Sequence, residues 1–514
     1  MTAASLAARR PRVVSTGTIA AALLALFAID NVVLLAFLGL PAPLAGVVAI
    51  AAAGGIFLLG RKVLRSMPEV PVSAIGISLA VAAVLLLLGG EGRLFFANAD
   101  WQIRDAVLND LAGQPWPFAY QAGGEALILR APLGMYLLPS LAGPGASADF
   151  ALLASNAVRL GLGLALAWPL FGSARARGIA VGVFILFSGW DSLGTALFWA
   201  AGVTTNWDHL EWWNFAFQYS SHITQLFWVP QHALAGWMCA VTFLLWRTGK
   251  APLGLFAATI PLVALWSPLA VIGAVPFALF AAVVTLAKRT LRGADVWLAA
   301  AALVTSLGAL AYLQLDAAKL GGGLIAAHPV VYALCILLEV IPFIYPLLRE
   351  RNSTDQDRPV LWLILGFLLI IPLFQVGMST DLQMRASIMP LALLALAFAQ
   401  WTVKLIENYP ARRTALAYAL VAILLSAATP AAELRRALTH PASPAPLCSL
   451  VDVWHRQSGM IVPLASYFSR VEALPSILAD IPVRVRAGAT TRCWARPWPG
   501  AETRDEPSND TARH

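Results

Sequence analysis

The chain is dominated by apolar runs of about twenty residues, which short polar segments separate. A helix needs about 20 apolar residues to cross the hydrocarbon core of a bilayer, and it satisfies its own backbone hydrogen bonds there. The runs are too long and unbroken for the alternating strands of a membrane β-barrel. We therefore predict an all-α, polytopic integral membrane protein with about thirteen transmembrane helices. The predicted spans are residues 15–39, 42–60, 72–90, 150–171, 178–199, 225–246, 252–268, 270–287, 295–313, 329–348, 359–377, 386–403 and 414–430.

The composition agrees with this pattern, since 59% of the 514 residues are hydrophobic, 12% are charged and the mean hydropathy is +0.74. The net charge of +8 does not indicate nucleic-acid binding, because the basic residues form short clusters between apolar runs. Such clusters mark the cytoplasmic side of a membrane protein. Arg9, Arg10 and Arg12 precede the first run as in a signal peptide. No small-residue cleavage site follows them, so we expect this run to remain as the first helix.

The basic clusters also set the topology. With the N-terminus in the cytoplasm, they all fall in cytoplasmic segments if the stretch LWSPLA, residues 265–270, separates two helices. One kinked helix there would turn every later cluster outward. The clusters are Arg9/Arg10/Arg12, Arg61/Lys62/Arg65, Arg175/Arg177, Arg247/Lys250, Lys288/Arg289/Arg292, Arg349/Arg351/Arg358 and Lys404/Arg412/Arg413.

This topology places three large loops and the C-terminal segment outside. In the tail, Cys448 and Cys493 are able to pair in an oxidising compartment. We predict a bacterial plasma (inner) membrane protein whose functional side faces the periplasm or exterior. The predicted parts are an N-terminal two-helix extension (1–71), a transmembrane module (72–430) with outer loops 91–149, 200–224 and 377–386, and a small extracytoplasmic tail (431–514).

Ionisable residues collect in these outer loops beside aromatic residues. In DWQIRDAVLNDL, residues 100–111, apolar positions recur at helical spacing, which predicts an amphipathic juxtamembrane helix at the membrane surface. Asp100 stands where such a helix would be capped. Asp105 and Asp110 follow on the same segment. For each of these carboxylates, exposure on a polar loop is the simple alternative to a function.

The first outer loop resembles that of the GT-C glycosyltransferases, such as the aminoarabinose transferases and protein O-mannosyltransferases. The resemblance rests on Asp100-Trp101, on Trp116-Pro117 and on Arg130-Ala131-Pro132-Leu133 with Tyr136, and it covers residues 72–200. The chain departs from the family pattern in lacking one proline after Arg130, in having Trp101 after Asp100, and in having two predicted spans before this loop. Later stretches, among them STDLQMRASIMP, are similar to those of a group of bacterial polytopic proteins that are described only as predicted glycosyltransferases.

The resemblance implies transfer of a sugar from a polyprenyl-phosphate donor to a lipid-linked or surface glycan acceptor. We predict no cofactor and no metal, because the spacing of Asp208, His209 and Glu211 matches no metal-ligand pattern and some GT-C enzymes work without a metal. The general base would be Asp100, with Asp105 as the second candidate. Capping of the helix by Asp100, and packing roles for the histidines, remain as alternatives. Arg385 has its own alternative, an i,i+4 pair with Asp381. The candidates for binding the donor phosphate are Arg104, Arg130, His222, His232 and Arg385.

Two other functions remain open. A transporter or flippase for lipid-linked glycans is favoured by Glu339 in mid-helix, and Asp30 and Asp191 also lie in predicted spans. A polymerase or ligase of surface polysaccharide would use the same lipid-linked substrates without requiring an acid at Asp100. An enzyme is favoured over a transporter, because apart from Glu339 the acidic residues gather at the outer side of the membrane, whereas transporters usually have paired charges near the midplane. The predicted partners are membrane lipids and these substrates, and we predict no nucleic acid.

Overall fold

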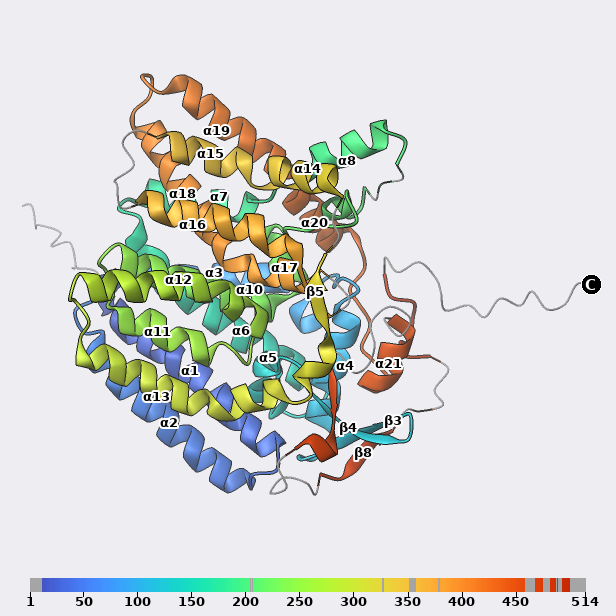
Figure 1. Ribbon diagram of the computed structural model, residues 1–514. Helices are drawn as coiled ribbons and strands as arrows, with labels where there is room; N and C mark the ends of the chain where they lie inside the picture. Colours follow the sequence, from blue (N-terminus) through green and yellow to red (C-terminus); the bar gives the residue numbers. More distant parts are fainter. Residues whose placement is uncertain are drawn as a thin grey trace, which may run out of the picture.

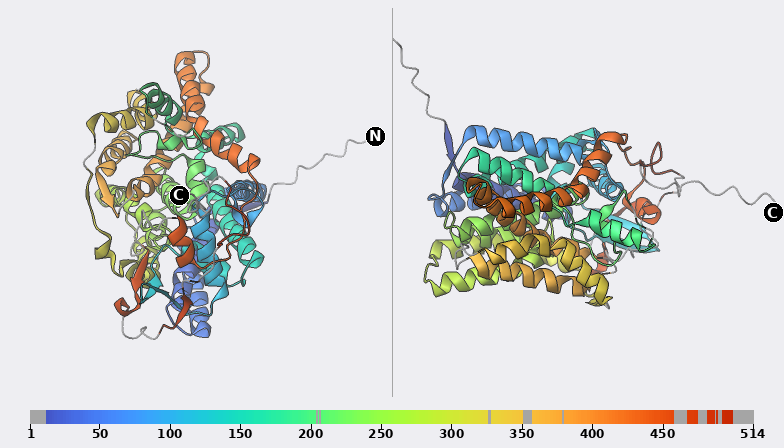
Figure 2. Two further views of the ribbon diagram at one scale, coloured as in Figure 1. Left: turned by 90° about the vertical axis from the view of Figure 1, so that its right-hand side faces the viewer. Right: turned by 90° about the horizontal axis from the view of Figure 1, so that it is seen from above.

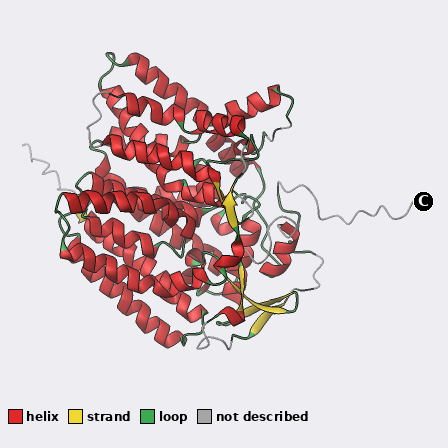
Figure 3. Ribbon diagram, in the orientation of Figure 1, coloured by secondary structure: helices red, strands yellow, loops and turns green. Residues whose placement is uncertain are grey.

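The computed structural model describes residues 12–203, 205, 207–325, 328–350, 357–377, 380–457, 467–474, 481–486, 488 and 492–499. Arg9, Arg10 and Arg351 of the predicted topology signals lie outside these residues. The chain forms a bundle of roughly side-by-side helices, with short strands mostly at one end (Figures 1 and 3).

The described helices and strands are as follows. The helices are α1 (Thr16–Phe37), α2 (Ala42–Val63), α3 (Val72–Leu88), α4 (Trp101–Gly113), α5 (Gly134–Ser140), α6 (Ala146–Ala167), α7 (Ala174–Leu186), α8 (Asp191–Ala200), α9 (His222–Trp228), α10 (Pro230–Arg247), α11 (Leu253–Leu262), α12 (Pro268–Ala287), α13 (Gly293–Gln314), α14 (Pro329–Glu339), α15 (Ile341–Arg349), α16 (Asp357–Ile370), α17 (Asp381–Ala386), α18 (Ile388–Glu407), α19 (Arg413–Ser426), α20 (Ala428–Thr439) and α21 (Leu450–Gln457). The strands are β1 (Val13–Ser15), β2 (Glu69–Pro71), β3 (Ala119–Ala122), β4 (Glu125–Leu129), β5 (Gly322–Leu324), β6 (Phe374–Val376), β7 (Phe468–Arg470) and β8 (Val483–Arg486).

Eight helices within the described ranges are long and apolar enough to cross a membrane, or nine if the bent pair α14–α15 is one span. The chain is therefore a mostly helical, multi-pass membrane protein. The predicted number of thirteen is not shown. The predicted segment 225–246 is divided between α9 and α10, neither of which is among these candidate spans. Three further predicted segments form shorter apolar helices. These are Val72–Leu88, Leu253–Leu262 and Arg358–Leu373.

The predicted break near residues 265–270 is present. Helix α11 ends at Leu262 and α12 begins at Pro268. Proline is favourable at the first position of a helix, where its missing N–H is not needed. The Ser267 hydroxyl accepts a hydrogen bond from Ala270 N at 3.1 Å and so caps α12.

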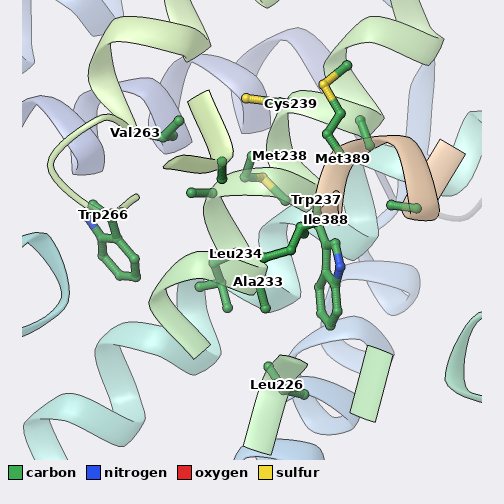
Figure 4. Close-up of a cluster of buried hydrophobic side chains, with 14 of the residues drawn as sticks. Leu226, Ala233, Leu234, Trp237, Met238, Cys239, Val263, Trp266, Ile388 and Met389 are labelled. Atoms are coloured by element: carbon green, nitrogen blue, oxygen red, sulfur yellow. The ribbon is translucent and has the colours of Figure 1, made fainter. Parts of the chain in front are cut away.

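Helix α10 lies in the centre of the bundle and is buried on nearly every side. Figure 4 shows its side chains, among them Leu234 and Trp237, packed with residues of α18 and of the α11–α12 connection. The contact with α18 is so close that a Cβ on Gly236 would lie 2.4 Å from Cγ2 of Ile388. Only glycine fits there, since packed interiors leave no room for an added methyl group.

An ion pair is buried between α1 and α6. Arg159 donates from Nη2 to both carboxylate oxygens of Asp30, at 2.8 and 2.7 Å, and Trp266 Nε1 donates to Asp30 at 2.9 Å. Both charged side chains are at most 1% exposed. Arg159 also lies over the rings of Phe27 and Trp266. Asp30 is therefore fully partnered within the bundle.

One end of the bundle carries the first predicted outer loop together with the C-terminal tail, and we call it the loop face (right side of Figure 1; facing the viewer in Figure 2, left). A four-stranded sheet joins the two segments in the order β7-β4-β3-β8. The hairpin β3–β4 turns at Gly123 and Gly124, which both have positive φ. Strands β7 and β8 come from the tail. The loop and the tail thus lie on one side of the bundle, joined by a sheet that was not predicted.

The tail is fixed to the loop in two further ways. Helix α21 packs on α4, and the Asp110 carboxylate of α4 accepts a hydrogen bond from Leu450 N at 2.8 Å. Cys448 and Cys493 form a disulfide within the tail. Such bonds persist in oxidising compartments.

Candidate active site

A cavity of about 470 Å³ opens at the loop face, where α4, α5, α9, α17 and the first residues of α10 and α12 meet. The tail closes one side of it with Leu450, Trp454 and Tyr467. Among the described residues that line it are two aspartates and three arginines, namely Asp100, Asp381, Arg104, Arg130 and Arg385. Three positive charges therefore face two negative charges. This excess of positive charge suits an anionic ligand.

Asp100 stands at the N-terminal boundary of α4, as predicted, but its side chain does not cap the helix. It pairs instead with Arg104 one turn along, with Oδ2 to Nη2 at 3.0 Å, and is 39% exposed toward the cavity. Arg104 is held from its other side, since its Nε donates to the Trp228 carbonyl at 2.8 Å. The carboxylate is thus accessible but fixed in position.

The other predicted phosphate ligands that line the cavity are Arg130, His232 and Arg385. Arg385 pairs with Asp381, as the alternative interpretation expected, and both residues still line the cavity. Burial lowers the pKa of Arg385, but the charges of Asp381 and Asp100 are among the effects that more than offset it, so the pKa lies above its ordinary value. The guanidinium stays charged. His232 shares a hydrogen bond of 2.8 Å between Nδ1 and the Ser267 hydroxyl.

Two predicted site residues lie away from the cavity. Asp105 faces the opposite side of α4 and pairs with Arg93 at 2.9 Å, and Arg93 also binds Asp149 at 2.7 Å. His222 stacks on Phe184, with ring centroids 3.9 Å apart, and its Nδ1 lies 2.8 Å from the Phe184 carbonyl oxygen. Both positions support packing of the loop face, and neither side chain reaches the groups that line the cavity.

Sequence reasoning missed the contribution of the tail. Tyr467 Oη donates to Asp381 Oδ2 at 3.4 Å, and the Tyr467 carbonyl accepts from Arg130 N at 2.7 Å. Tyr467 thereby connects two of the cavity's charged residues. No motif in the sequence predicts this role, because the position of Tyr467 depends on pairing between β4 and β7, which come from distant parts of the chain.

Asp110 shows how burial acts on the loop face. Burial raises the pKa of Asp110 to about 7 from an ordinary value of 3.8, although the hydrogen bond from Leu450 N opposes the rise. The folded state thus binds a proton that the unfolded chain releases near pH 4. The stability from this proton is complete below about pH 4 and is lost as the pH rises to about 7.

We expect Asp110→Asn to reduce the pH dependence of stability. The amide still accepts the hydrogen bond from Leu450 and does not titrate. Between pH 4 and 7, thermal unfolding in detergent should show wild type losing up to about 1.4 kcal/mol more per pH unit than the variant. Asp208→Asn is the control, since Asp208 is 78% exposed. Equal slopes for wild type and Asp110→Asn would contradict the burial argument.

A second group of acids lies behind the cavity wall, formed by Asp191, Glu211 and Glu339, each at most 2% exposed. Glu339 accepts from Trp213 Nε1 at 2.9 Å, and Asp191 accepts from the Thr429 hydroxyl at 2.8 Å. Burial and the charge of Asp191 raise the pKa of Glu211 to about 7. Glu211 also binds Gln218, which lines the cavity.

No family model, curated protein or solved structure matches this chain. Within the part of the chain that the structure describes, no group of three histidine, cysteine, aspartate or glutamate side chains could hold a metal ion.

Proposed function

We propose that this chain is an inverting membrane glycosyltransferase of the GT-C type. It would move a sugar from a polyprenyl-phosphate donor to a lipid-linked or cell-surface acceptor at the outer face of the membrane. The observation that carries the proposal is the placement of the Asp100 carboxylate in one cavity with Arg104, Arg130 and Arg385 at the end of an apolar helical bundle. A base beside several cations is what transfer from a phosphate ester to a hydroxyl requires.

The chemistry follows from these groups. The acceptor hydroxyl gives its proton to the Asp100 carboxylate, and the acceptor oxygen forms a bond to the anomeric carbon. The bond between that carbon and the phosphate oxygen breaks, and the electron pair leaves with the polyprenyl phosphate. Arg385 and Arg130 stabilise the negative charge that develops on the phosphate. Arg104 keeps Asp100 in place.

The proposed topology has thirteen passes with a cytoplasmic N-terminus. Each of the thirteen predicted segments contains a described helix, including the short helices α3, α11 and α16. The joined loop and tail lie on one face. The proposed topology requires this, because the loop follows the third pass and the tail follows the thirteenth. In this orientation the cavity opens at the outer leaflet, where a polyprenyl-phosphate sugar donor would reach it.

We expect Arg385→Gln to raise KM for a polyprenyl-phosphate sugar by about 10–100-fold, because a hydrogen bond to a charged group contributes about 1.5–3 kcal/mol. The assay is transfer of labelled sugar by purified protein in proteoliposomes. Arg385→Lys keeps the charge and should recover part of the affinity. Thermal unfolding of each variant separates weak binding from misfolding. A well-folded Arg385→Gln protein with wild-type KM would remove Arg385 from the phosphate site.

The buried acids favour a second candidate, a proton-coupled transporter of lipid-linked glycans. Glu339 is the last residue of α14, and the pair α14–α15 is bent by 60° at that point. Broken helices and buried acids at membrane depth are typical of transporters. The same proteoliposomes distinguish the candidates. An enzyme forms a new glycosidic bond, whereas a transporter moves intact lipid-linked glycan between leaflets and stops when Glu339 becomes Gln.

A further inference from the structure

A second polar pocket lies at the face opposite the loop face, where the α10–α11 and α12–α13 connections meet (left side of Figure 1). Its volume is about 290 Å³. The polar residues that line it are Ser66, Lys250, Thr285, Thr290, Arg292 and Asp295. It shares no residue with the proposed active site.

The pocket favours an anion. Helices α11 and α13 both begin at it, since Pro252, Leu253 and Arg292 are among its lining residues. Helix α13 is already capped, since Arg292 N donates to Asp295 Oδ2 at 3.3 Å, whereas α11 has no side-chain cap. The uncapped N–H groups and the dipole at a helix N-terminus attract negative charge.

The side-chain charges act in the same direction. Asp295 is neutralised by Arg292, which binds it through Nε at 3.0 Å and Nη2 at 2.6 Å. Lys250 has no ion pair with any described residue, so its charge is the excess in the pocket.

A buried hydroxyl is also left for a ligand. Thr285 is 3% exposed, and its Oγ1 has no hydrogen-bond partner among the described residues. In α10, by contrast, the Thr242 hydroxyl bonds to the Met238 carbonyl one turn earlier. A buried hydroxyl without a partner is unfavourable, so a ligand oxygen in the pocket would relieve that cost.

An apolar groove of about 540 Å³ continues from this pocket along α11, α12 and α13. The two cavities share Leu253 and Asp295. The groove is lined by residues such as Ala257, Ala300 and Leu303 and ends at Leu310 on α13. Two of its lining residues, Val296 and Leu303, are 51% and 47% exposed. The groove therefore opens toward lipid.

We propose that this site binds one anionic phospholipid of the leaflet opposite the loop face. The phosphate lies in the polar pocket near Lys250, the helix N-termini and the Thr285 hydroxyl. One acyl chain lies in the groove. Basic pockets between transmembrane helices on the cytoplasmic side are suited to anionic headgroups, and the joined apolar groove selects a lipid over a soluble anion. This inference is independent of the proposed function.

Native mass spectrometry of the full chain, titrated with phosphatidylglycerol or phosphatidylcholine in mixed micelles, tests the site. We expect one tightly retained phosphatidylglycerol and no equivalent phosphatidylcholine. Lys250→Gln should weaken retention about fivefold, the equivalent of about 1 kcal/mol for one cation near an anionic surface. Lys62→Gln is the matched control, because Lys62 is an exposed lysine of a neighbouring cluster on this face that lines neither cavity. Equal loss in both variants would indicate only diffuse surface charge and would overturn the proposal.

A second variant tests the groove separately. Ala300→Phe fills the apolar part and leaves the polar pocket intact, because Ala300 lines the groove and is half-buried, so the larger side chain extends into the open groove. We expect this variant to lose the tightly bound phosphatidylglycerol. Inorganic phosphate is added alone as a third arm. Displacement of the lipid by millimolar phosphate, or undiminished retention in Ala300→Phe, would show that no acyl chain contributes, contrary to the proposal.

Discussion

Asp100→Asn is expected to lower the turnover number for sugar transfer by about 10²–10⁴-fold, the usual contribution of a general base. The amide keeps the size of the side chain but cannot take the proton of the acceptor hydroxyl. KM for the donor should change little, because Asp100 does not bind the phosphate. Steady-state kinetics in proteoliposomes measures both constants.

The control for this variant is Asp208→Asn, which removes another loop-face carboxylate that pairs with Arg435 at the surface. It should retain full activity. Asp105→Asn gives a further comparison, because Asp105 supports Arg93 and not the cavity. It should lower thermal stability and leave the turnover of folded protein near wild type. Wild-type turnover from Asp100→Asn would exclude the proposed base.

Asp30→Ala is expected to destabilise the bundle by about 3–5 kcal/mol, the cost of leaving one member of a buried ion pair without its partner. The substitution leaves the Arg159 guanidinium without a counter-charge and removes the acceptor of Trp266 Nε1. Unfolding in mixed micelles, followed by tryptophan fluorescence, measures the difference.

The double variant Asp30→Leu with Arg159→Met separates charge from packing. It removes both charges and keeps apolar volume, so it should recover most of the lost stability. A double variant as unstable as Asp30→Ala would show that shape, and not the unpaired charge, dominates at this position.

The sequence predicted the bundle because long apolar runs have few structural solutions in lipid. It did not predict which runs would form full-length helices. The segment 252–268, for example, contains Pro261 and gives only the ten-residue helix α11. The hairpin β3–β4 had a readable signal in Gly123-Gly124 between two short runs. Its tail partners had none, because pairing of distant strands depends on how the whole bundle folds.

The candidate site was predicted in part. Helical spacing placed Asp100 and Arg104 one turn apart, and they do meet in the cavity. The same spacing puts Asp105 on another face of α4, so the sequence contained the reason to separate it from Asp100. His222 could not be assigned, since stacking on Phe184 is a tertiary contact. Tyr467 entered the site only through the sheet.

The order in which the strands of the loop-face sheet are synthesised determines when the cavity is complete. Strands β3 and β4 precede most of the helices in synthesis, while β7 and β8 follow all of the described bundle. One wall of the cavity is thus supplied last, and a chain whose insertion stalls has an open, unfinished pocket. Completion of the cavity is thereby linked to insertion of the last helices.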